Sequence, residues 1–285
     1  MPELRELERK MNSAKALGEV VGAMRNLAAI YVRRAESAVE AIREYSEIVQ
    51  TGLIVLLDRL AVGDRSAPTE GRCVALVFAG DQGLCGTYND RVVAAALKFG
   101  ESSPVPVDFI SIGRRGYELL SARGKEPVLG APAATSVEGV KAQLPGLAAD
   151  IFDKYTELGG TELKFVYNAY EGMGRFKETV RPVLPPVRDM LDESRAAALG
   201  YDPIITASPA ELLGAFFEEY FYIELCRALL ESHCSENGAR LISMTAAGSN
   251  IDDRLIELTQ TFQSARQDSI TSELLDVVGG AEALL

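Results

Sequence analysis

The stretch SPAELLGAFFEEYFYIELCRALL, residues 208–230, decides the fold because it opens a helix that no later proline interrupts. Ser208 suits the N-cap, Pro209 suits the first helical position, and Glu211 three residues after the cap completes a capping box. Apart from Pro2, every proline lies between Pro68 and Pro209. Both ends of the chain are therefore predicted to form very long helices.

Apolar residues recur in the C-terminal segment 208–285 at alternating steps of three and four, which is typical of a coiled-coil seam. The seam breaks at Arg227, Asn237 and Gly248, and polar residues at such positions can fix the register. Its members are Leu213, Phe216, Tyr220, Ile223, Arg227, Leu230, Cys234, Asn237, Leu241, Met244, Gly248, Ile251, Leu255, Leu258, Phe262 and Ala265.

The N-terminal segment 1–62 has a matching seam that breaks only at Gly18, Arg25 and Ser46. Its members are Leu4, Leu7, Met11, Ala14, Gly18, Val21, Arg25, Ala28, Val32, Ala35, Val39, Ile42, Ser46 and Val49. Two seams flanking one compact domain predict an antiparallel two-helix coiled coil, although two successive globular amphipathic helices remain an alternative.

The two helices are predicted to differ in length, about 85 Å for the N-terminal one and about 105 Å for the C-terminal one. Counting back from Ser208 places the first residue beside roughly residue 266. The segment 266–285, RQDSITSELLDVVGGAEALL, is then an unpaired tip that carries Leu274, Leu275, Val277, Val278, Leu284 and Leu285. An exposed apolar end of this kind indicates a partner surface, with fraying as the alternative.

The central segment 72–206 alternates strand-like and helical patterns. Strands are expected at 73–79, 105–112, 163–169 and 179–184, and helices near 90–99, 115–122 and 137–158. This alternation predicts a Rossmann-like α/β domain with a mainly parallel sheet. The fold class is therefore α/β, with a long antiparallel two-helix coiled coil formed by the terminal segments.

A glycine-rich turn follows the first expected strand, in CVALVFAGDQGLCGTYN, residues 73–89. Strand, loop and helix in this order are typical of phosphate-binding sites, with Gly80, Gly83 and Gly86 supplying tight backbone geometry. The turn nevertheless lacks both the GxGxxG spacing and the GK[ST] ending. A nucleotide-dependent enzyme built on this domain is an alternative that the motif supports weakly.

Composition narrows the function further. A formal net charge of -12 disfavours nucleic acid as a partner, and no apolar run is long enough to cross a bilayer. The charged N-terminus is unlike a signal peptide, so a soluble cytoplasmic protein is expected. Four cysteines without paired spacing are expected to be reduced and packed in apolar places. His233 is expected to have a surface or packing role rather than to bind a metal. We expect no metal and no cofactor.

Four stretches resemble the γ subunit of F-type ATP synthases. The C-terminal one, from Ala265 to Ala281, follows the family pattern A-R-Q-x-x-I-T-x-E-x-x-E-I-V-x-G-A with small changes. The others are SENGARLISMTAAGSN (235–250), DQGLCGTYN (81–89) and GAMRNLAA (22–29). The resemblance therefore covers both termini and the start of the central domain.

The resemblance implies a non-catalytic rotor shaft that couples ion flow through a membrane sector to ATP synthesis or hydrolysis. The implied partners are the α and β subunits of the catalytic ring, the ε subunit and the membrane c-ring, at the cytoplasmic face of a bacterial plasma membrane. Arg266, Gln267, Thr271 and Glu273 match motif positions that touch β-subunit loops, and Arg240 and Met24 match positions lower on the shaft.

Several departures resemble the divergent γ subunit of the alternative, N-type F-type ATPase. Thr245 stands where the family has lysine, Gly248 falls within the helix, and the turn reads DQGLCGT rather than DRGLCGG. That subtype implies an ion-pumping hydrolase, with protons or sodium selected by other subunits. A coiled-coil adaptor of an unrelated complex remains the second alternative.

Overall fold

The computed structural model describes residues 2–60, 71–172, 174–186, 200 and 203–282. The chain forms two compact units, one of residues 1–27 with 241–285 and one of residues 28–240. Two helices, α1 (Pro2–Arg59) and α6 (Pro209–Glu282), contribute to both units. Helix α6 begins at Pro209, as the capping pattern predicts.

The first unit is an antiparallel helix pair. Gly18 of α1 faces Ile251 of α6, where an added Cβ would lie 3.4 Å from Cγ2, and Val21 faces Gly248. Moving three residues toward the C-terminus of α1 thus corresponds to moving three residues toward the N-terminus of α6. The first residues of α1 therefore lie opposite about residue 267, close to the expected residue 266. The long antiparallel coiled coil of the predicted fold is confirmed.

The predicted seams are the buried faces of both helices. Every seam member except Arg25 is at least partly buried. The polar breaks serve specific contacts: Ser46 donates to Glu224 (2.6 Å), Arg227 donates to Glu231 (2.9 Å), and Asn237 donates to the His233 carbonyl (2.9 Å). Of these three contacts, the one from Ser46 joins α1 to α6, and the other two lie within α6.

The second unit is built on a five-stranded sheet in the order β3-β2-β1-β4-β5, parallel except for the antiparallel pair β4 and β5. Its elements along the chain are β1 (Cys73–Phe78), α2 (Tyr88–Ser102), β2 (Val107–Ile112), α3 (Arg114–Ser121), β3 (Leu129–Ala131), α4 (Val137–Glu157), β4 (Glu162–Gly172) and β5 (Arg175–Leu184). The predicted mainly parallel sheet is confirmed.

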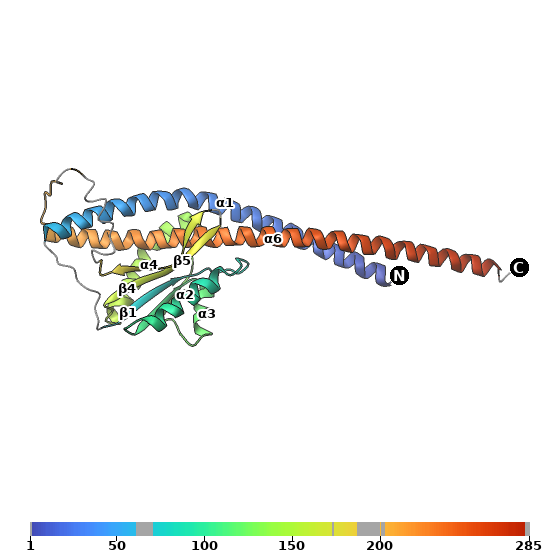
Figure 1. Ribbon diagram of the computed structural model, residues 1–285, viewed down its shortest axis with the longest axis horizontal. Helices are drawn as coiled ribbons and strands as arrows, with labels where there is room; N and C mark the ends of the chain where they lie inside the picture. The colour runs from blue at the N-terminus through green and yellow to red at the C-terminus, as the bar shows by residue number, and fades with distance from the viewer. Residues whose placement is uncertain (1, 61–70, 173, 187–199, 201–202, 283–285) are drawn as a thin grey trace. The chain divides into compact units, whose positions relative to one another are not determined.

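Helices cover both faces of this sheet (Figure 1). Val77 and its neighbours on one face pack with Val93 of α2 and Leu120 of α3. Leu76 and its neighbours on the other face share a core with Ile151 of α4, and with α1 and α6. Strand β1 is buried at all six positions because it is covered on both sides, which explains its continuous apolar sequence.

Strands β3 and β5 differ most from the expected elements. Strand β3 is a three-residue edge strand, LGA, too short to produce an alternating pattern. Strand β5 begins at Arg175 rather than at residue 179. The sequence pattern missed its first residues because they include exposed charged side chains at the edge of the sheet. None of the described helices has a stretch apolar and long enough to span a bilayer.

The four cysteines are free thiols, and all but the half-buried Cys226 are buried. His233 is buried and packs edge to face on Tyr31 with ring centroids 5.8 Å apart. Burial lowers the pKa of His233 below its ordinary value, so the ring is neutral near pH 7. Of the surface and packing roles that the sequence left open, His233 has the packing role.

Candidate functional site

The glycine-rich turn after β1 places the carboxylate of Asp81 at the N-terminus of α3. Asp81 Oδ1 accepts hydrogen bonds from the backbone N–H of Arg114, at the start of α3, and of Ala133, at 2.7 and 3.3 Å. Helix N-termini bind anions through these same donors. Asp81 therefore ties the turn after β1 to the start of α3 and to the segment after β3.

The backbone of this turn differs from the expected one. Left-handed φ angles occur at Leu84 (63°) and Gly86 (57°), and not at Gly80 or Gly83. Gly80 is needed for a different reason, because an added Cβ would lie 2.6 Å from Cδ of Glu236 on α6. The turn is therefore shaped for close approach of α6.

Open α/β sheets bind ligands at the carboxyl ends of the strands where the strand order reverses. In this sheet the strand order reverses between β1 and β4, and α6 occupies the crevice at that point. Tyr88 donates to the Ser232 carbonyl (3.0 Å), while Ser235 donates to the carbonyl of Asn168 (2.8 Å). Polar groups that could face a ligand in this crevice bind the chain's own helix instead.

Arg240 belongs to this buried contact. Its guanidinium lies 2.5 Å from Glu236, donates to Asn237 (2.9 Å) and reaches the carbonyl of Gly83 (3.5 Å). Burial raises the pKa of Glu236, and the charge of Arg240 offsets only part of that effect. Only 8% of Arg240 is exposed, so its charge is neutralised inside the 28–240 unit.

The other residues selected by resemblance lie in the helix-pair unit. Arg266, Gln267, Thr271 and Glu273 are all exposed on α6, and Thr271 donates to the Gln267 carbonyl (2.9 Å). Met24 is partly buried on α1 in the same unit.

Exposed apolar side chains interleave with these polar residues. Ile270, Leu274 and Leu275 are 48%, 61% and 67% exposed, and every side chain from 270 to 275 is exposed. The side chains of Val277 and Val278, and residues Leu284 and Leu285, lie outside the described part. We call the exposed surface of residues 266–275 the tip of α6.

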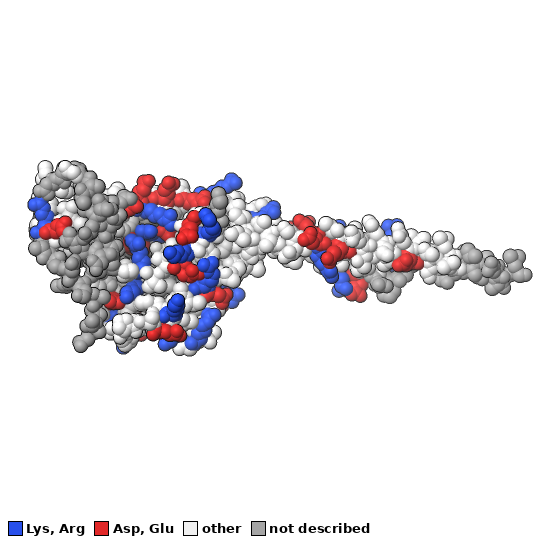
Figure 2. Space-filling view, viewed as in Figure 1, with Lys and Arg blue, Asp and Glu red and all other residues white. Residues whose placement is uncertain are grey.

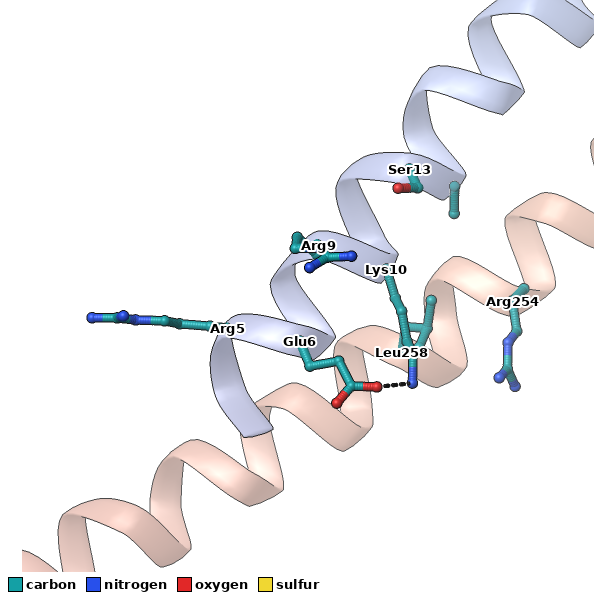
Figure 3. A pocket seen from close by; sticks show the side chains of 8 residues that line it. Arg5, Glu6, Arg9, Lys10, Ser13, Arg254 and Leu258 are labelled. Atoms are coloured by element: carbon teal, nitrogen blue, oxygen red, sulfur yellow. Dashed lines mark ion pairs between the residues drawn. The ribbon is translucent and has the colours of Figure 1, made fainter. Parts of the chain in front are cut away.

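Sequence reasoning missed a basic groove on the helix pair (Figure 3). Arg5, Arg9 and Lys10 of α1 and Arg254 of α6 line an open hollow of about 840 Å³. Lys10 is paired with Glu6 at 2.7 Å, in the ion pair drawn in Figure 3, and Arg254 is paired with Glu257 at 2.6 Å. The signal in the sequence is the charge cluster at the start of α1.

Charge is distributed differently over the α/β part of the 28–240 unit. Basic and acidic side chains are interspersed on the face drawn in Figure 2, without a continuous patch of one sign. Exposed ion pairs join Arg114 and Arg115 to Glu118 on α3, and Arg123 to Asp90 of α2. Such a surface does not favour a polyanion.

Comparison with known proteins agrees with this architecture. The family model described as ATP synthase matches residues 3–284. The chain is 30% identical over 297 residues to the ATP synthase gamma chain of Geotalea daltonii, covering 100% of this chain and 99% of that one. It is 29% identical to the ATP synthase gamma chain of Picosynechococcus sp., covering 100% of both.

Solved structures share the fold. A chain of the Euglena gracilis mitochondrial ATP synthase, in its OSCP/F1/c-ring structure, has a TM-score of 0.66 at 16% identity, covering 99% of this chain and 95% of that one. A chain of the Tetrahymena thermophila central stalk and c-ring structure has a TM-score of 0.61 at 18% identity, covering 80% and 99%. With a family model over nearly its whole length and a full-length relative at 30% identity, the chain belongs to the ATP synthase gamma chain family.

Proposed function

We propose that this chain is the rotor shaft of an F-type ATPase that couples ion flow through a membrane sector to ATP synthesis or hydrolysis. The observation that carries the proposal is the tip of α6, which continues past its helical partner with exposed polar and apolar side chains. A shaft that turns inside a ring needs weak contacts that can form and break. The chain itself carries out no chemistry.

The proposed partners are the α and β subunits of the catalytic ring, the ε subunit and the c-ring, at the cytoplasmic face of a bacterial plasma membrane. We assign Arg266, Gln267, Thr271 and Glu273 to contacts with the β subunit, because their side chains are exposed at the tip of α6. Met24 is proposed to provide a contact lower on the helix pair.

Arg240 is buried, unlike the residues at the tip of α6 that are assigned to the β subunit. Its guanidinium is bound by Glu236, Asn237 and the Gly83 carbonyl. We therefore propose that a contact of Arg240 with the β subunit needs this buried arrangement to open. In the closed arrangement, Arg240 holds the turn after β1 against α6.

The subtype proposed is the alternative, ion-pumping N-type enzyme. Its support is the loss of positive charge on α6, where Thr245 is exposed and donates to the Leu241 carbonyl (2.8 Å) at a position that is lysine in the family pattern. The complex would then hydrolyse ATP to move protons or sodium, with the ion selected by other subunits.

Co-expression with the cognate α and β subunits tests the rotor proposal. We expect a stable complex whose ATPase activity is cooperative and depends on this chain. The matched control omits the chain, and recovery of the same activity from α and β alone would contradict the proposal. Calorimetric titration of the isolated chain with ATP or ADP addresses the enzyme alternative, because stoichiometric micromolar binding would favour a nucleotide site.

A further inference from the structure

Two glutamates of α6, Glu224 and Glu231, are the most completely buried charges of the 28–240 unit that the structure describes. Their side chains are 1% and 0% exposed, and they lie seven residues apart on one face of the helix. Each is bound at the same time by α1 and by the sheet. We call this pair the carboxylate clamp.

Glu231 joins three elements. Arg43 of α1 and Arg227 of α6 each donate to its Oε1 at 2.9 Å, and the backbone N–H of Tyr170 on β4 donates to its Oε2 at 3.2 Å. Arg43 also donates to the carbonyl of Tyr170 at 2.7 Å. Helix α1, helix α6 and strand β4 therefore meet at one carboxylate.

Glu224 repeats the arrangement two turns earlier. Ser46 of α1 donates to its Oε1 at 2.6 Å, and Gln50 lies 3.3 Å from the same oxygen. Arg181 of β5 approaches both carboxylate oxygens, with its Nη2 3.1 Å from Oε1 and its Nε 2.5 Å from Oε2. The second contact thus ties the same two helices to the neighbouring strand.

Stability alone does not account for these charges. Well-packed apolar residues of similar volume often stabilise a protein as well as a buried ion pair does, because taking charges out of water is costly. Apolar packing has no preferred direction, whereas charge-assisted hydrogen bonds have fixed lengths and angles. Buried ionic contacts therefore fix the relative position of layers that could otherwise slide.

We propose that the carboxylate clamp transmits torque between the α/β sheet and α6, with Glu224 and Glu231 acting as positioning residues. The inference rests on the proposed rotor function, in which the membrane sector drives the α/β domain and α6 acts on the catalytic ring. Torque then acts as shear between the sheet and α6. Contacts from β4 and β5 at two points along α6 resist that shear.

The test uses the complete enzyme in inverted membrane vesicles, carrying Glu224→Gln or Glu231→Gln. A voltage-sensitive dye reports the membrane potential built by ATP hydrolysis, whichever cation is moved, and ATP consumption is followed in parallel. We expect each variant to keep hydrolysing ATP while the steady membrane potential falls. The reason is that ATP hydrolysis becomes partly uncoupled from ion transport when the membrane potential opposes that transport. Adding an ionophore that removes the load should erase the difference in hydrolysis between variant and wild type.

Glu218→Gln is the matched control, because it removes the same charge from an exposed position of α6. Arg43→Gln provides a second variant if a glutamate variant does not assemble, since the Arg43 side chain is 37% exposed and Arg227 still pairs with Glu231. Variants that build the wild-type potential at the wild-type hydrolysis rate would overturn the clamp. A wild-type enzyme that builds no potential from ATP would instead overturn the rotor proposal.

Discussion

The environment of Glu231 predicts how the stability of the isolated chain depends on pH. Burial alone would raise the pKa of Glu231, but the hydrogen bond from Arg43 and the charge of Arg227 outweigh burial, and its pKa lies below the ordinary value of 4.5. A carboxyl group whose pKa is lowered on folding stabilises the fold above its unfolded pKa. That stabilisation is lost as the pH falls through the lower, folded value.

We therefore expect Glu231→Gln to lower the free energy of unfolding by about 1.5–3 kcal/mol near neutral pH. The difference from wild type should shrink as the pH falls from 4.5 through the lower pKa of Glu231 in the folded chain. Denaturant unfolding at a series of pH values measures it, with Glu218→Gln as the control. A difference that stays constant down to the acid limit would mean that the carboxylate charge contributes nothing.

Residues such as Glu231 could not be found from the sequence. Glu224 and Glu231 each follow directly after a seam residue, Ile223 and Leu230, so the pattern assigns them to a flank that water usually covers. The sheet covers that flank instead, which makes α6 buried on nearly all sides between residues 220 and 240. Seam patterns describe a helix pair and contain no information about a third layer.

At the scale of elements, two glycines of α6 predict opposite effects of the same substitution. An added Cβ at Gly238 would lie 2.7 Å from the backbone Cα of Gly174, before β5. At Gly248 the nearest atom is Cγ1 of Val21 at 4.0 Å, an ordinary contact. Helix α6 thus needs glycine at residue 238 and only tolerates it at residue 248.

We expect Gly238→Ala to destabilise the chain by about 1–3 kcal/mol, since backbone must move. Gly248→Ala should stabilise it by up to about 1 kcal/mol, because alanine favours the helix more than glycine does. Thermal unfolding of the two variants beside wild type gives both signs in one experiment. Equal shifts in the same direction would show that α6 does not approach the β4–β5 turn in this way.

The tip of α6 gives a prediction by deletion. All described side chains after Ser269, from Ile270 to Leu275, are exposed, so removing the segment after Ser269 takes away little of the packing that the structure describes. The isolated chain should keep the melting temperature of wild type, while the assembled ATPase loses coupling. A marked fall in melting temperature would show that the segment packs on the rest of the chain, and full coupling would remove the tip from the proposed contact surface.

Among the elements, long periodic helices and buried strands were predictable, and short or edge elements were not. The seams of α1 and α6 repeat over many turns, so single polar breaks do not hide them. Strand β3, at three residues, cannot show a period. The end of β4 and the start of β5 depend on pairing with each other, which no local pattern records.

At the scale of the whole molecule, α1 and α6 both continue without a break from one compact unit into the other. A rotor built in this way should turn with its two helices as one body. Replacing Gly18 and Ile251 by cysteine tests this, because the Cβ of residue 18 would lie 3.4 Å from Cγ2 of Ile251. Three of the four native thiols are buried, which limits competing disulfides, and Cys226 is half-buried.

We expect the oxidised double variant to keep full ATP-driven rotation, because the bond joins parts that do not move against each other. The closed loop should raise the stability of the isolated chain by about 4–5 kcal/mol, less any strain at the new bond. Reduction with a thiol returns the same protein to the unlinked state and is the internal control. If oxidation stops turnover and reduction restores it, α1 and α6 must shift against each other during each cycle, and the helix pair would be a moving part of the mechanism rather than a rigid shaft.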